Sequence, residues 1–169
     1  MDFPISGNDV ITDKRILDVL CEGLALSPDD DIVGVYRTQI NDVLVHVSAQ
    51  KYAGLEPKFG VLAAIECRGI SVTADVEEGK EPRVDFLSRF FTPAGSMPED
   101  AVTGSAHCAL AKYWSERLNK TSLYGHQTCP SRGGYVSMEL PSDQADRVLI
   151  LGEGCIFRRG WLSTWPTQM

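Results

Sequence analysis

Hydrophobic positions recur at helical spacing in two stretches of the chain. In residues 16–26 the apolar side chains fall on one face of a helix, with Thr12 as a candidate N-cap and Ser27-Pro28 as the stop. The second stretch, residues 106–118, begins directly after Thr103-Gly104-Ser105, and its first half is rich in small residues. The pattern therefore predicts two main helices, the second able to pack closely against strands.

Most other apolar positions lie in short runs that are typical of β-strands. Residues 32–36 and 43–48 predict one hairpin, and residues 61–67 and 70–76 predict another with its turn at Arg68-Gly69. Residues 51–59 suit a short helix or loop, and residues 77–82 suit a charged loop. Further strands are expected at residues 84–91, 123–128, 135–140, 148–151 and 155–157. This order is not an alternating βαβ array, so it predicts an α+β domain.

Composition narrows the class of protein. The chain has 169 residues, of which 43% are hydrophobic and 23% charged, as expected for a single globular domain. A net charge of −7 gives no general attraction to nucleic acid or to a membrane surface. The five cysteines are widely spaced, and neither a signal peptide nor a membrane-spanning run is visible. We therefore expect a cytoplasmic protein with free thiols.

The sequence around the start of the second helix carries the main candidate chemistry. Thr103, Gly104 and Ser105 would present backbone N–H groups at the positive end of a helix dipole, which suits a carboxylate or phosphate. Glu99-Asp100 lie just upstream, where a carboxylate could face the bound group. A simpler interpretation is that Thr103 or Ser105 is only an N-cap and that the acids merely favour the dipole. Spacing alone leaves both interpretations open.

Other chemical signals in the sequence are weaker. His107 and Ser105 would diverge by about 200° on a helix, which argues against a nucleophile pair and favours a core or surface histidine. His46 and His126 are remote from it in sequence, so no metal site is expected. Residues 131–134 (SRGG) could cradle an anion, although a turn between strands suits them better. No motif for a nucleotide cofactor, an α/β-hydrolase or a zinc protease is present.

Several short motifs between residues 85 and 164 occur together in one known family. They are Arg89-Phe90-Phe91, the segment PEDAVTGSA at residues 98–106, Tyr113-Trp114, Gln127, Arg132-Gly133-Gly134, Gly152, Gly160 and Leu162. In this stretch the chain resembles the C-terminal half of the PhzF-like proteins of phenazine biosynthesis. Before residue 85 the similarity lies only in the order of helix and strands.

The resemblance implies a diaminopimelate-epimerase-like fold. Members of the family have two similar α+β domains, each with a curled, mostly antiparallel sheet around a central helix, and an active site between the domains. By this resemblance residues 1–169 form a single domain equivalent to the C-terminal one, and the N-terminal domain is absent. The helix that starts near Gly104 would be the central helix.

The same resemblance implies roles for four residues. Asp100 and Ser105 would act in catalysis, Asp100 by holding a polar group of the substrate. Gly104 and Ser105 would donate to the substrate carboxylate, with Thr103 also lining the binding site. The related epimerases have a cysteine where this chain has Val102, which argues against two-thiol racemisation. The resemblance thus implies proton transfer by a carboxylic acid on a small carboxylate-bearing metabolite, without cofactor or metal.

One departure from the family affects the expected activity. The family's general acid/base is a glutamate in a Ser-Glu-Thr-like stretch of the first domain, accompanied by a Gly-His pair, and neither occurs in this sequence. We therefore expect a substrate-binding domain that is inactive alone and that associates either as a homodimer, which would still lack the glutamate, or with a separate N-terminal domain. Asp29, Asp30 or Asp31 would be the only substitutes for the missing base. The alternative is a non-catalytic module that binds a small anion or another protein.

Overall fold

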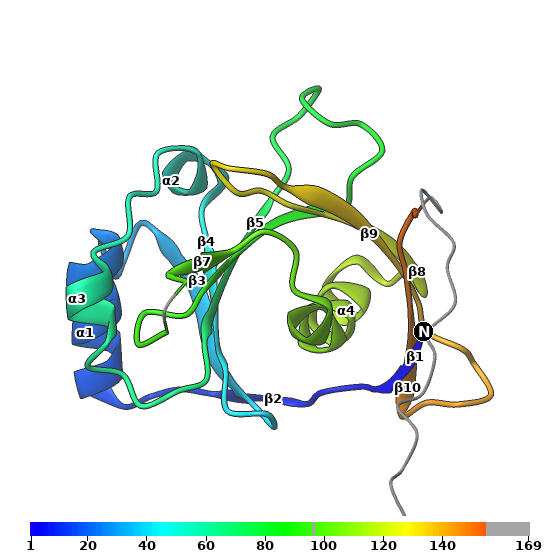
Figure 1. The fold of residues 1–169 in the computed structure, drawn as a ribbon, viewed down its shortest axis with the longest axis horizontal. Coiled ribbons are helices and arrows are strands. Elements are labelled where there is room, and N and C mark those ends of the chain that lie inside the picture. The colour runs from blue at the N-terminus through cyan, green and yellow to red at the C-terminus, as the bar shows by residue number, and fades with distance from the viewer. Residues whose placement is uncertain (96, 155–169) are drawn as a thin grey trace, which may run out of the picture.

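The protein is a curled β-sheet wrapped around one long helix. The computed structural model describes residues 1–95 and 97–154 (Figure 1). Helix α4 (Gly104–Leu118) lies inside the curve, while α1 (Lys14–Leu24), α2 (Ala49–Ala53) and α3 (Phe59–Leu62) lie outside it. The strands are β1 (Asp2–Pro4), β2 (Asn8–Val10), β3 (Ile32–Thr38), β4 (Val43–Val47), β5 (Ile70–Asp75), β6 (Phe86–Phe91), β7 (Glu99–Asp100), β8 (Ser122–Gln127), β9 (Gly134–Glu139) and β10 (Arg147–Leu151).

The topology of the sheet explains where α4 lies. The strand order is β1-β10-β9-β8-β6-β5-β4-β3-β2, and β7 adds to β6. Strands β4 and β5 are parallel, as are β6 and β8, and the other described pairs are antiparallel. A parallel pair requires a crossover connection, and α4 belongs to the one between β6 and β8. The expected α+β fold, a mostly antiparallel sheet curled around a central helix, is confirmed.

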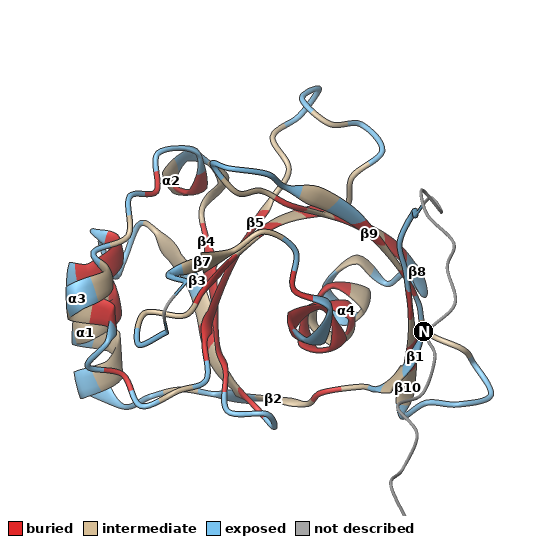
Figure 2. Cartoon of the chain, viewed as in Figure 1, coloured by how far each residue is buried: buried red, intermediate tan, exposed pale blue. Residues whose placement is uncertain are grey.

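The sheet separates two hydrophobic cores. Alternate residues of β4 point to opposite faces, and all five are buried, because helices cover both faces (Figure 2). On the convex face Val43, Val45 and Val47 pack with residues of α1 and α3. On the concave face Leu44 packs with residues of α4, where Trp114 stacks on Phe86 with ring centroids 5.2 Å apart. The concave core holds α4 in place.

The N-terminal segment crosses the open side of the curl, as Figure 1 shows. Strand β1 pairs with β10 and β2 pairs with β3, so residues 2–10 connect the two ends of the sheet. Between these strands the amide of Ser6 donates to the carbonyl of Cys108 at 3.3 Å. The side-chain amide of Asn8 donates to the carbonyl of Ala109 at 3.2 Å. This segment therefore holds the middle of α4 from the side that the sheet leaves open.

Several sequence-based expectations differ from the structure. Helix α1 starts at Lys14 with Asp13 as its N-cap, not Thr12, because the Asp13 carboxylate accepts from the amide of Arg15. Residues 61–67 were expected to be a strand but form α3 and a turn, so there is no hairpin at Arg68-Gly69. Instead β5 pairs in parallel with β4. Short apolar runs such as 61–67 suit a strand or a buried helix equally well.

The remaining differences are small. The short strands β1, β2 and β7 were not expected, and the strand expected at residues 155–157 lies outside the described residues. Four cysteines in the described part of the chain, Cys21, Cys67, Cys108 and Cys129, are free thiols, as expected. Over residues 1–95 and 97–154, no helix combines the length and the apolar character needed to cross a membrane.

Candidate functional site

Strand β7 and helix α4 place the predicted site residues at one end of the sheet. Asp100 pairs with Phe90 at the end of β6, and the chain then turns through Thr103 into α4. Thr103 is the N-cap residue, with an extended backbone (φ −109°, ψ 95°), but its side chain does not cap the helix. Its hydroxyl instead donates to the carboxylate of Asp100 at 2.6 Å. The simple N-cap interpretation is therefore right about the position of Thr103 and wrong about its side chain.

A buried glutamine holds this turn. Gln127, at the end of β8, is 1% exposed. Its Oε1 accepts from the amide of Thr103 at 2.8 Å, and its Nε2 donates to the carbonyl of Asp100 at 2.8 Å and to the Thr103 hydroxyl at 3.3 Å. One side chain from the sheet thus fixes both Asp100 and the start of α4. The sequence offered no signal for this role beyond the place of Gln127 in the family motif.

The N-terminus of α4 is open. Gly104 and Ser105 are exposed, and a Cβ added at Gly104 would meet nothing within 4 Å. The first amides of a helix lack acceptors within it and carry the positive end of its dipole. A cavity of about 440 Å³ lies on the Gly104 side, lined in part by Val102 and Gly134, and one of about 220 Å³ lies on the Ser105 side. The structure therefore brings the four predicted site residues together, and two of them, Gly104 and Ser105, line free space.

Two glycines of the SRGG segment have a packing role. A Cβ at Gly133 would lie 2.6 Å from the carbonyl oxygen of Gln127, and one at Gly134 would lie 2.6 Å from a methyl of Val102. Glycine is therefore needed for β9 to start close to Gln127 and to the turn before α4. This supports a turn, not an anion cradle, for residues 131–134.

The histidines make internal contacts. His107 is fully buried, and its Nδ1 donates to the carbonyl of Thr103 at 2.8 Å, so it is a core histidine that does not pair with Ser105. Burial lowers its pKa. His46 lies on β4 between the Tyr113 hydroxyl (2.7 Å) and the Asp75 carboxylate (3.2 Å), and burial lowers its pKa to about 4. His126 pairs with Glu81 at 2.9 Å. In the residues that the structure describes, no cluster of His, Cys, Asp or Glu could hold a metal ion.

The acidic run at residues 29–31 lies away from this site. It follows α1 on the convex side, where Asp31 accepts from the amide of Ser27 at 2.7 Å. The run ends next to Ile32, which pairs with Val47 at the last residue of β4. The site lies at the opposite end of β4, where Val43 is level with Ile70 and Phe91 of the neighbouring strands. The structure therefore does not bring Asp29, Asp30 or Asp31 together with Asp100.

The fold and the site define an epimerase-type α+β protein whose central helix is open at its N-terminus. Comparison with known proteins agrees with this class. The chain belongs to the phenazine biosynthesis-like (PhzC-PhzF) family, whose model matches residues 1–160. It is 38% identical over 143 residues to an uncharacterized isomerase of Halalkalibacterium halodurans, covering 85% of this chain and 50% of that protein. It is 37% identical over 164 residues to an uncharacterized isomerase of Pseudomonas aeruginosa, covering 96% and 56%.

Solved structures show the same fold. A putative phenazine biosynthesis PhzC/PhzF protein from Clostridium difficile superposes with a TM-score of 0.76 at 29% identity, covering 97% of this chain and 57% of that one. A PhzF-family protein from Enterococcus faecalis superposes with a TM-score of 0.73 at 33% identity, covering 89% and 52%. The chain therefore spans about half the length of the relatives it matches.

Proposed function

We propose that this chain is the C-terminal, substrate-binding domain of a PhzF-like isomerase that binds a small carboxylate-bearing metabolite at the N-terminus of α4. The observation that carries the proposal is the open helix end at Gly104 and Ser105, with Asp100 held beside it by Gln127 and Thr103. Membership of a family whose relatives include proteins named isomerases supports the reaction class.

In the proposed mechanism the substrate carboxylate accepts hydrogen bonds from the amides of Gly104 and Ser105 and from the Ser105 hydroxyl. Such donors stabilise the negative charge that spreads onto the carboxylate when the neighbouring C–H loses its proton. Asp100 orients a polar group of the substrate from the side, because its own position is fixed by two hydrogen bonds. The proton moves to and from a carboxylic acid on the N-terminal domain of the isomerase, which a second copy of this chain would not supply, and no cofactor takes part.

The second domain would cover the open end of α4. Exposed apolar side chains lie around this end of the sheet, including Val102 beside the larger cavity and Met97 in the loop before β7. We propose that this surface meets either a separate N-terminal domain or a second copy of this chain, in the cytoplasm. Sedimentation over a range of concentrations tests the second-copy form: a concentration-dependent dimer is expected, and a strict monomer contradicts it.

Carboxylate binding can be tested by titrating the ¹⁵N-labelled chain with acetate and, as a neutral control, acetamide. We expect the amide signals of Gly104 and Ser105 to shift with acetate, with a Kd on the order of 1–10 mM, and not with acetamide. Shifts of equal size with both compounds, or none at these two amides, would contradict the proposal.

Activity is tested separately by incubating the chain in deuterated water with L-lactate and with small L-amino acids. Because the proposal places the proton-transferring acid on a separate N-terminal domain, and a second copy of this chain does not supply it, the chain should not exchange the α-hydrogen of these compounds, whether it is a monomer or a homodimer. Exchange catalysed by the chain alone would show that the base lies within it and would overturn the two-domain mechanism. Acetate binding without exchange in any assembly would instead favour a non-catalytic anion-binding module.

A further inference from the structure

An ion pair at the end of β6 holds the strand that carries Asp100. Arg89 Nε donates to Glu99 Oε1 at 2.7 Å and Arg89 Nη2 donates to Glu99 Oε2 at 2.9 Å, so the pair is bidentate. Arg89 Nη1 also donates to the carbonyl of Leu55 at 2.7 Å. The two side chains are only 11% and 12% exposed, and the guanidinium lies 5.0 Å from the ring centroid of Phe91. Each charge is thus largely removed from water and compensated by the other.

The strand held by this pair is very short. Strand β7 has two residues, Glu99 and Asp100, which pair with Phe91 and Phe90. The loop before it returns to β6 through the hydrogen bond from the amide of Thr92 to the carbonyl of Pro98 at 2.9 Å. So short a strand has little stability of its own. Its place depends on the Arg89–Glu99 pair on one side of Asp100 and on Gln127 on the other.

We propose that Arg89 is a positioning residue that fixes the Asp100 carboxylate beside the N-terminus of α4 by holding Glu99. The meaning of this position for catalysis rests on the proposed function, but the position itself does not. Arg89 acts from the convex face of the sheet. It acts through Glu99, the residue that precedes Asp100 in the sequence, and makes no contact with the substrate.

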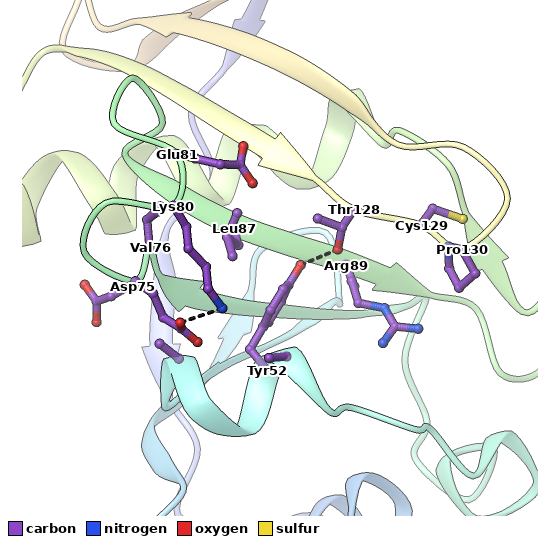
Figure 3. A pocket seen from close by; sticks show the side chains of 13 residues that line it. Tyr52, Asp75, Val76, Lys80, Glu81, Leu87, Arg89, Thr128, Cys129 and Pro130 are labelled. Carbon is purple, nitrogen blue, oxygen red and sulfur yellow. Dashed lines mark hydrogen bonds and ion pairs between the residues drawn. The ribbon is translucent and has the colours of Figure 1, made fainter.

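A cavity on the convex face makes this role open to chemical test. About 370 Å³ of space lies between α2, the loop after β5 and the segment that follows β8, and Arg89 lines it (Figure 3). Figure 3 shows Arg89 beside Tyr52, whose hydroxyl bonds to that of Thr128 at 2.7 Å. The charged groups here are paired with other protein groups, including Lys80 with Glu77 at 2.6 Å. Because Arg89 lines this cavity, a small solute could reach the space that the Arg89 side chain occupies once that side chain is removed.

The experiment compares Arg89→Ala and Arg89→Lys with Arg68→Ala as a matched control. Arg68 also pairs with a carboxylate, that of Asp42, and its guanidinium lies 5.3 Å from the ring centroid of Phe90, but no hydrogen bond or ion pair joins Arg68 to Glu99 or Asp100 of β7. Two signals report on the site: the carboxyl ¹³C signal of Asp100 and the rate of solvent exchange of the Thr103 amide, referred to the Leu110 amide in the middle of α4. Guanidinium ion is then added at concentrations that leave the wild type folded.

In Arg89→Ala we expect the Asp100 signal to move and the Thr103 amide to exchange about tenfold faster relative to Leu110. Guanidinium should enter through the cavity, pair with Glu99 and restore both signals towards their wild-type values. Arg89→Lys keeps the positive charge but not the bidentate geometry, so it should change the Asp100 and Thr103 signals less. It should also remain folded even if Arg89→Ala does not fold. Arg68→Ala should change neither signal, and guanidinium should not affect it.

Unchanged Asp100 and Thr103 signals in both Arg89 variants would overturn the proposal. So would equal changes in Arg68→Ala, or a lack of rescue by guanidinium in a folded Arg89→Ala. A titration of the wild-type protein with acetate, followed in the same NMR spectra, separates this inference from the proposed function. If acetate does not bind while the Arg89 variants behave as described, the proposed function fails and the positioning role stands.

Discussion

At the scale of single residues, the site depends on side chains that reach it from a distance in sequence. A helix is usually capped by a serine, threonine or aspartate that precedes it. The start of α4 is instead held by Gln127, which binds the amide of Thr103 and lies 24 positions after Thr103 in the chain. The local sequence shows Thr103, Gly104 and Ser105 at the helix start, and those positions could be predicted. The hydrogen bonds of Gln127 could not, because they depend on β8 lying beside β6 in the sheet.

The role of Gln127 predicts a large effect of its replacement. In Gln127→Leu the buried Thr103 amide and the part-buried Asp100 carbonyl lose their partners, which should cost about 2–4 kcal/mol of unfolding free energy. The exposed Gln39 offers a control, and Gln39→Leu should change stability by less than about 0.5 kcal/mol. Urea denaturation of both variants checks this. Similar midpoints for Gln127→Leu and the wild type would show that the site has another anchor.

His46 predicts a dependence of stability on pH. The charged groups near it are Asp75 and Arg117, but burial dominates and lowers its pKa from the usual 6.5 to about 4. The folded state therefore binds fewer protons than the unfolded state between these values. The stabilisation is complete above pH 6.5 and is lost as the pH falls towards 4, by roughly 3 kcal/mol in total.

Replacement of His46 should therefore weaken the loss of stability between pH 6.5 and 4, measured by urea unfolding at several pH values. His46→Gln retains a group that can bond to the Tyr113 hydroxyl. An equally steep pH dependence in His46→Gln would show that other groups cause it.

At the scale of elements, long periodic segments could be predicted and short ones could not. The apolar stripe and small residues of α4 indicated its start and end, because they fit one face of a helix against a sheet. The sequence predicts a strand at residues 61–67, where the structure has α3 and a turn, because an apolar run of this length lacks a decisive period. Strands β1, β2 and β7 have only two or three residues each, and only pairing across the sheet defines them.

The contact between α1 and α3 predicts opposite effects of the same substitution at two helical glycines. A Cβ at Gly23 in α1 would lie 2.4 Å from a methyl of Leu62, which is fully buried, whereas one at Gly60 in α3 would meet nothing within 4 Å. Gly23→Ala should therefore destabilise the protein by about 1–3 kcal/mol through overpacking. Gly60→Ala should stabilise it by up to about 1 kcal/mol through helix propensity. Thermal unfolding of the two variants checks the signs, and a stabilising Gly23→Ala would show that Leu62 can move aside.

At the scale of the whole molecule, the curled sheet brings remote segments to one end of α4. The site combines the turn at residues 100–105, the end of β8 and the start of β9, and the first residues of the chain approach it from the open side. Sequence motifs pointed to Asp100, Thr103, Gly104 and Ser105, and the structure places them together. The Arg89–Glu99 pair and the convex-face cavity next to it appear only in three dimensions, because they join residues from five parts of the chain: 49–55, 75–81, 87–89, 99 and 128–130.

The most direct test of the account is the affinity for acetate of Gly104→Pro compared with that of Gly104→Ala. Gly104 is the first residue of α4, where proline is tolerated, and the extended backbone of Thr103 suits a residue before proline. Proline removes the N–H donor that the account assigns to the substrate carboxylate, whereas alanine keeps it and adds a methyl into open space. We predict that acetate binds about tenfold more weakly to Gly104→Pro and within about twofold of the wild type to Gly104→Ala. Equal affinity of the two folded variants would contradict carboxylate binding at the N-terminus of α4.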